Sequence, residues 1–136
     1  MSTLDLLLSA DKGKMETPTG EKNITRLSKQ LGKPVIFKYR ALTPDEDAEI
    51  RKEGIKFNSK GEFEDLDSSE MQCYQILHGV IDPSFKSDEL SKKFGGGSPI
   101  DTIKAILLPG EISALATAIQ DLSGFGEGAV EDLKNE

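Results

Sequence analysis

The chain has 136 residues and a formal net charge of −7, with 36% hydrophobic and 30% charged residues. A chain of this length is expected to form one domain with a core that needs neither metals nor disulfides. The one cysteine excludes an internal disulfide, and the one histidine excludes a zinc site built on a histidine pair. The sequence also lacks a P-loop, a dinucleotide fingerprint and a calcium loop, so it favours a protein that works by binding.

The charge is distributed unevenly along the chain. Residues 1–60 carry 12 Lys or Arg and 9 Asp or Glu, whereas residues 61–136 carry 5 Lys and 15 Asp or Glu. The acidic second half disfavours nucleic-acid binding, because phosphate contacts supply most of that affinity. The asymmetry is typical either of steering toward a charged protein partner or simply of solubility. The apolar run at residues 6–8 is too short for a signal peptide or a membrane span.

The first part of the chain is expected to form a flexible tail over residues 1–21, with a short amphipathic helix at residues 3–8, and then a small sheet. Alternating hydrophobicity predicts a strand at residues 35–42, with Lys38 and Arg40 on its polar face. Its hairpin partner is expected at residues 24–27. The six cations of residues 22–44 indicate either a docking surface for an acidic protein or nucleic acid, or the more common protection of an edge strand.

Short helices are expected to follow, separated by Pro and Gly. Thr43 and Pro44 mark the start of a helix that ends near Gly54, and a small hairpin is expected between residues 55 and 64. Further helices are predicted at residues 67–81, 87–94, 99–108 and 111–123. The predicted fold class is therefore α+β and mainly α, with a small N-terminal β-sheet or hairpin followed by a compact bundle of four to five short helices. Residues 22–125 would form the single globular domain, and residues 126–136 an acidic C-terminal tail.

The chemically reactive side chains lack the neighbours that catalysis or metal binding requires. His78 lies beside an apolar stripe on its predicted helix, and Cys73 precedes it by five residues, which places the two on different faces. Cys73 is interpreted as a small buried packing residue, and His78 as either a packed or a surface residue. The glycines at residues 95–97 lack the Lys and Ser or Thr of a phosphate-binding loop and are interpreted as a hinge. No catalytic residue, metal ligand or cofactor is therefore expected.

An ordered series of short motifs runs through the second half of the chain. It comprises GVIDP at residues 79–83, KSDEL at 86–90, FG at 94–95, SPID at 98–101, LLPGEI at 107–112, IQDLSGF at 119–125 and LKN at 133–135. GKPV at residues 32–35 and RALT at 40–43 extend it toward the N-terminus. This series resembles the XkdN-like tail assembly chaperones of PBSX-type prophages and related tailed phages, and the resemblance spans about residues 22–135.

The resemblance implies a protein that binds the tape measure protein of a phage tail, keeps it soluble and promotes polymerisation of the tail tube around it. The tail tube protein is a further candidate partner, whereas neither nucleic acid nor a membrane is expected. Such a chaperone acts in the host cell cytoplasm and is absent from the mature virion. A long, partly apolar helical chain would otherwise aggregate before the tube covers it. The alternative is a structural or adaptor subunit that stays in the tail.

The partner surface is expected on the C-terminal helices. A groove between the helices at residues 99–108 and 111–123 would receive an amphipathic partner helix. Its expected partner-binding residues are Ile103, Leu107, Leu108, Ile112, Leu115, Ile119 and Phe125. The competing interpretation is a filled core, which is favoured for Ile112 and Ile119. If the partner helix is basic, the acidic surroundings would give its binding a salt-dependent on-rate.

Overall fold

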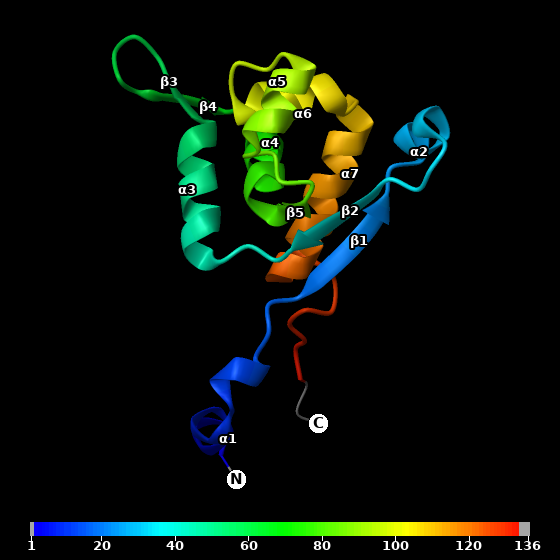
Figure 1. Ribbon diagram of the computed structural model, residues 1–136. Coiled ribbons are helices and arrows are strands. Elements are labelled where there is room, and N and C mark those ends of the chain that lie inside the picture. Colours follow the sequence, from blue (N-terminus) through cyan, green and yellow to red (C-terminus); the bar gives the residue numbers. More distant parts are fainter. Residues whose placement is uncertain (1, 134–136) are drawn as a thin grey trace.

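Alternating apolar and polar side chains place β2 (Ile36–Arg40) at the centre of the main sheet. The computed structural model describes residues 2–133 (Figure 1), and in it β2 pairs antiparallel with β1 (Thr19–Asn23) and with β5 (Val80–Asp82). Phe37 and Tyr39 are buried on one face, whereas Lys38 is exposed on the other. The predicted alternation is confirmed. Because β2 is the central strand, however, the cation on it does not protect a sheet edge.

The connection between β1 and β2 contains a helix, α2 (Thr25–Leu31). The prediction of a strand at residues 24–27 is therefore wrong. Residues 26–31 contain no β-branched side chain, and Gly32 ends the helix in the left-handed conformation with a φ of 73°. The true partner strand, β1, has the polar sequence TGEKN, which carries no alternating pattern.

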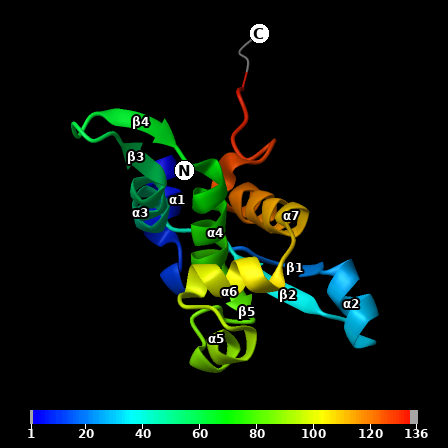
Figure 2. The ribbon, with the colours of Figure 1, turned by 90° about the horizontal axis from the view of Figure 1, so that it is seen from above.

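The core forms where three helices meet the buried face of the sheet. These helices are α4 (Ser68–Gly79), α6 (Pro99–Ile106) and α7 (Pro109–Gln120), which Figure 2 shows around the middle of the molecule. The fully or almost fully buried side chains of the core cluster are Phe37, Cys73, Ile76, Phe85, Ile103, Leu115 and Ile119. A Cβ atom on Gly79 would lie 2.7 Å from Cδ1 of Ile119, so glycine permits this close approach of α4 and α7.

Within residues 2–133 no single helix is long and apolar enough to cross a membrane. Helix α6 and the helical segment from Pro109 to Phe125 reach the length and composition of a membrane span only when they are taken together, and the two are bent by 117° relative to each other.

Two hairpin-forming strands and a helix lie beside this core. Helix α3 (Pro44–Gly54) packs on α4, and the hairpin of β3 (Ile55–Phe57) and β4 (Phe63–Leu66) projects from its end (Figure 1). The predicted helix start at Thr43 is confirmed, because its hydroxyl accepts a hydrogen bond from the backbone N–H of Glu46. The hairpin expected between residues 55 and 64 is also confirmed, although β4 continues to Leu66.

The remaining elements are short. Helix α5 (Asp88–Phe94) follows the sheet, and one π-helical turn, η2 (Asp121–Phe125), continues α7. At the N-terminal end, α1 (Thr3–Ser9) and the 3₁₀ turn η1 (Lys12–Lys14) form an arm with no buried residue. The predicted tails over residues 1–21 and 126–136 include residues 1 and 134–136, which lie outside the described residues.

The expected order of an N-terminal sheet followed by a helical bundle is wrong. The described residues form seven α-helices and five strands in two small sheets, and the strands are interspersed among the helices. The clearest error is at residues 80–82, whose apolar side chains fit the helical spacing of α4. The residue before a proline is disfavoured in a helix, and Pro83 follows directly. The chain therefore leaves α4 at Gly79 and forms β5, which completes the main sheet.

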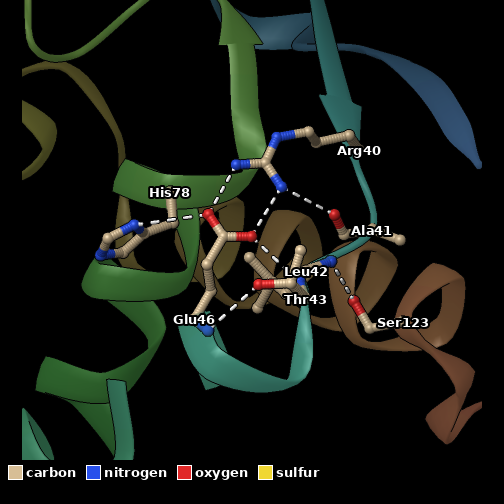
Figure 3. Close-up of polar contacts among 7 residues, drawn as sticks. All are labelled: Arg40, Ala41, Leu42, Thr43, Glu46, His78 and Ser123. Atoms are coloured by element: carbon tan, nitrogen blue, oxygen red, sulfur yellow. Dashed lines mark hydrogen bonds and ion pairs between the residues drawn. The ribbon is translucent and has the colours of Figure 1, made fainter. Parts of the chain in front are cut away.

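An arginine fixes the junction between β2 and α3 (Figure 3). The guanidinium of Arg40 donates to both carboxylate oxygens of Glu46, at 2.8 and 2.7 Å, and to the carbonyl of Ala41 at 2.9 Å. These hydrogen bonds, with one from the backbone N–H of Thr43, lower the pKa of Glu46 to about 2. In the same corner, the Ser123 hydroxyl accepts from the backbone N–H of Leu42 at 2.8 Å and thereby ties η2 to this junction.

Candidate protein-docking site

An open hollow lies between α2 and the N-terminal half of α7. Figures 1 and 2 show α2 at the far end of the β1–β2 pair, apart from the other helices. The hollow has a volume of about 490 Å³. Its apolar lining comprises Ile24, Leu108, Ala114 and Leu115, and its remaining lining residues are Lys22, Asn23, Thr25, Arg26, Gly110 and Glu111. We call this hollow the α2–α7 site.

The register of β1 explains why the site is open. Gly20 pairs with Tyr39 and Lys22 pairs with Phe37, so both face the buried side of the sheet. Gly20 leaves room for the Tyr39 ring, because a Cβ atom there would lie 2.8 Å from its Cζ atom. Lys22, in contrast, is exposed and lines the hollow. A charged side chain therefore occupies a position on the inner face of β1 where an apolar residue would extend the core.

Arg26 fixes one wall of the α2–α7 site. Its Nε and Nη2 atoms donate to the two carboxylate oxygens of Glu111 at 3.1 and 2.9 Å, and Nη2 also donates to the carbonyl of Ile106 at 2.8 Å. Glu111 in turn accepts from the backbone N–H of Leu108 at 2.7 Å. The hydrogen bonds from Arg26 lower the pKa of Glu111, and the same contact raises the pKa of Arg26. The charged pair thus holds α2 against the corner between α6 and α7.

Lysines border the apolar lining. A second hollow of about 440 Å³ shares Asn23 and Thr25 with the first, and Lys29 and Lys33 line it. Lys22, Lys29 and Lys33 are exposed, and within the described part of the chain none of the three forms an ion pair. Among residues 2–133, Glu111 is the only carboxylate that lines either hollow, and Arg26 neutralises it. The site is therefore an apolar depression with a basic border on a chain that is acidic as a whole.

The seven predicted partner-binding residues are divided between the core and the surface. Ile103, Leu107, Ile112, Leu115 and Ile119 are at most 9% exposed, whereas Leu108 is 51% and Phe125 is 59% exposed. Of the seven, Leu108 and Leu115 line the α2–α7 site. Phe125 lies beyond the other end of α7, where it borders two smaller hollows of about 260 and 270 Å³. Contact of any of the seven with a partner stays a prediction.

The sequence analysis did not predict the wall of the site that the N-terminal part of the chain forms. Ile24 and Arg26 form one wall, yet residues 24–27 were expected to pair as a strand. The only sequence signal at this wall is the run of cations without an acidic residue from 22 to 44. That run does not reveal which cations are bound by carboxylates of the chain itself and which stay free.

Cys73 lies in the core, whereas His78 is half-buried beside α3. Cys73 is 2% exposed, and burial raises the pKa of its thiol. Nδ1 of His78 lies 3.8 Å from a carboxylate oxygen of Glu46 (Figure 3). Among residues 2–133, no three His, Cys, Asp or Glu side chains are grouped so that they could hold a metal ion.

Two further surfaces expose apolar side chains. Four leucines of α1, at residues 4, 6, 7 and 8, are 57–75% exposed. Phe57 and Phe63 are register partners on the β3–β4 hairpin and are 61% and 63% exposed.

Comparison with known proteins places the chain in a family. The family of phage XkdN-like tail assembly chaperone proteins matches residues 4–136. The chain belongs to this family. It is similar to the phage-like element PBSX protein XkdN of Bacillus subtilis strain 168, with 26% identity over 115 residues, which cover 82% of this chain and 77% of XkdN. It is also 25% identical over 107 residues to YqbN of the same strain, an uncharacterised protein, covering 76% of this chain and 71% of YqbN.

The fold agrees with this relationship. The crystal structure of YqbN superposes with a TM-score of 0.65 at 24% sequence identity, covering 85% of this chain and 92% of the other. The family is one of phage tail assembly chaperones.

Proposed function

We propose that this chain binds the tape measure protein of its phage, keeps it soluble and promotes polymerisation of the tail tube around it. Membership of the tail assembly chaperone family supports a role in assembly. The observation that carries the proposal is the α2–α7 site, an apolar depression of about 490 Å³ whose walls are already in place. A chaperone of this kind works by covering apolar side chains of its client, and each leucine-sized side chain that it buries contributes about 1.5–3 kcal/mol.

The charge of the chain fits the same role. The net charge of −7 on 136 residues would add solubility to a complex with a client that aggregates by itself. The protein would act in the host cell cytoplasm, with the tail tube protein as a further partner, and leave before the tail is complete. Neither a nucleic acid nor a membrane has a part in this proposal.

A second candidate is a structural or adaptor subunit that stays in the tail. The exposed leucines of α1 favour it, because a permanent subunit would bury such an arm against its neighbours. The two candidates differ in where the chain is found after assembly. Mass spectrometry of purified mature particles would detect a retained subunit in amounts comparable to other tail proteins, and would not detect a chaperone that leaves.

Co-expression tests the proposed function itself. The tape measure protein of the same phage is expressed alone, with this chain, and with an unrelated acidic protein of similar size. We expect the tape measure protein to remain soluble and to co-purify only with this chain. Equal solubility in all three cases, or solubility without co-purification, would contradict the proposal.

A further inference from the structure

We propose that the partner segment that occupies the α2–α7 site is acidic. Its apolar side chains enter the depression formed by Ile24, Leu108, Ala114 and Leu115, while its carboxylates lie against Lys22, Lys29 and Lys33. This inference rests on the proposed function, because it specifies the part of the tape measure protein that this chain binds. The case of a basic partner helix, which the acidic C-terminal half left open, does not apply at this site.

The balance of free charges around the site carries the argument. Of the carboxylates in the described part of the chain, one, Glu111, lines the two adjoining hollows, and both of its oxygens accept hydrogen bonds from Arg26. Three exposed lysines remain without an ion pair within residues 2–133. A basic segment would meet like charges at this border, whereas carboxylates would meet ammonium groups. The local charge and not the net charge of the chain therefore decides which partner fits.

The apolar lining and the fixed walls determine how the segment binds. Leu115 is 1% and Ile24 is 6% exposed, so they form a floor that belongs to the core. Leu108 and Ala114 are exposed and form the opening. Because the contacts of Arg26 with Glu111 and with the carbonyl of Ile106 already hold α2 in place, little ordering of the site would oppose binding.

The chain itself contains two alternative occupants. Residues 126–133 combine three carboxylates with Val130 and Leu133, which are 89% and 88% exposed. The leucines of α1 are also uncovered. Either segment, from a second copy of the chain, would produce self-association that depends on the α2–α7 site. The experiment must therefore measure partner binding and self-association on the same variants.

The charge test uses the full chain and the tape measure protein as the probe, with the dissociation constant measured at low and at high salt. The double variant Lys22→Glu/Lys29→Glu reverses two border charges, and Lys12→Glu/Lys60→Glu makes the same change at exposed positions outside both hollows. We expect the border variant to weaken binding at least about tenfold at low salt and to lose most of the salt dependence. The control variant should bind within about twofold of the wild type.

A neutral variant tests the depression separately from its charge. Ala114→Gln places a longer side chain in the opening, and Thr117→Gln makes a matched change at an exposed position of α7 outside the hollow. We expect the first to weaken binding and the second to leave it unchanged, with both melting temperatures close to that of the wild type.

The possible outcomes separate this inference from the proposed function. If the wild-type chain does not bind the tape measure protein, the proposed function fails. If the wild type binds, but the border variant binds equally well or more tightly, the proposed function stands and the acidic partner segment is excluded. Sedimentation that shows self-association of the wild type, lost in the border variant, would assign the site to a second copy and would also overturn the inference.

Discussion

Two arginines from the same basic stretch of sequence make the same contact in two different surroundings. Arg40 binds Glu46 near the start of α3, and Arg26 binds Glu111 near the start of α7. Both glutamates follow a proline by two residues, and each accepts a hydrogen bond from the backbone N–H of the residue before that proline. Each arginine also donates to a backbone carbonyl nearby. Locally the two junctions are equivalent.

The surroundings of the two junctions differ. At the α3 junction, Ser123 binds the backbone of Leu42 and His78 lies beside Glu46, so side chains from η2 and α4 adjoin the junction (Figure 3). At the α7 junction, the Arg26–Glu111 pair borders the open α2–α7 site. The same local contact therefore lies beside side chains of two other elements at one junction and holds one wall of a depression at the other. The residues around an Arg–Glu pair, and not the pair alone, therefore decide whether it only stabilises the fold or also borders a candidate docking site.

The largest expected effect distinguishes the floor of the α2–α7 site from its opening. Leu115 is 1% exposed, so Leu115→Ala should lower the free energy of unfolding by about 2–5 kcal/mol. Leu108 is 51% exposed, and Leu108→Ala should change it by less than about 1 kcal/mol. Urea denaturation of both variants provides the measurement. Equal losses would show that the floor and the opening are not distinct.

The second prediction concerns the α3 junction and its dependence on pH. Glu46→Gln should lower the free energy of unfolding by about 1–3 kcal/mol at pH 7, because charge-assisted hydrogen bonds to Arg40 are lost. The pKa of Glu46 is lowered from 4.5 to about 2 in the folded chain. Its stabilising contribution is therefore complete above the unfolded pKa and is lost as the pH falls through the folded pKa.

The wild type and Glu46→Gln should thus differ most above pH 5 and become equally stable near pH 2. Urea denaturation at several pH values measures this difference, and Glu49→Gln on the exposed side of α3 is the control. A difference that stays constant from pH 7 to pH 2 would show that the charge of Glu46 is not the source of its contribution.

The third prediction concerns the open α7 junction. Glu111→Gln should lower the melting temperature less than Glu46→Gln, because the pKa of Glu46 is lowered further below its ordinary value, to about 2, than the pKa of Glu111. Its main effect should be local, with faster hydrogen exchange in α2 than in α3. A loss of melting temperature equal to that of Glu46→Gln, with uniform changes in exchange, would remove the distinction between the two junctions.

The smallest expected effect concerns the two residues that a catalytic hypothesis would use. His78→Gln and Cys73→Ala should leave tail assembly intact in a complementation assay, provided that each variant folds. Neither side chain faces the α2–α7 site, and Cys73 is buried. Failed assembly by a variant with an unchanged melting temperature would show that the protein has a chemical activity in addition to binding.

The elements with strong local signals were predictable from the sequence. Thr43 and Pro44 mark the start of α3, and Ser87 caps α5 through the backbone N–H of Leu90. Strand β1 was missed because its polar residues gain their regular structure only by pairing with β2. Strand β5 was misassigned because its apolar residues suit a helix and a strand equally well, and the pairing with β2 decides between them.

The candidate site was predictable only in part. Leu108 and Leu115 were expected to face a partner, and both line the α2–α7 site. The opposite wall includes Arg26, which is 85 residues from Glu111 in the sequence. No periodicity within one helix reveals a contact over that separation, so the groove was placed between α6 and α7. There the expected lining residues Ile103, Leu107, Ile112 and Ile119 are buried.

Hydrogen exchange of this chain with and without the tape measure protein is the most direct test of the α2–α7 site. The account predicts added protection in two separate segments, residues 22–26 and residues 108–115, which contain the lining residues of the site. The α3 junction at residues 40–46 should exchange equally in both samples. Protection confined to α1 or to the β3–β4 hairpin, with no change in either predicted segment, would contradict the assignment of the α2–α7 site as the docking surface.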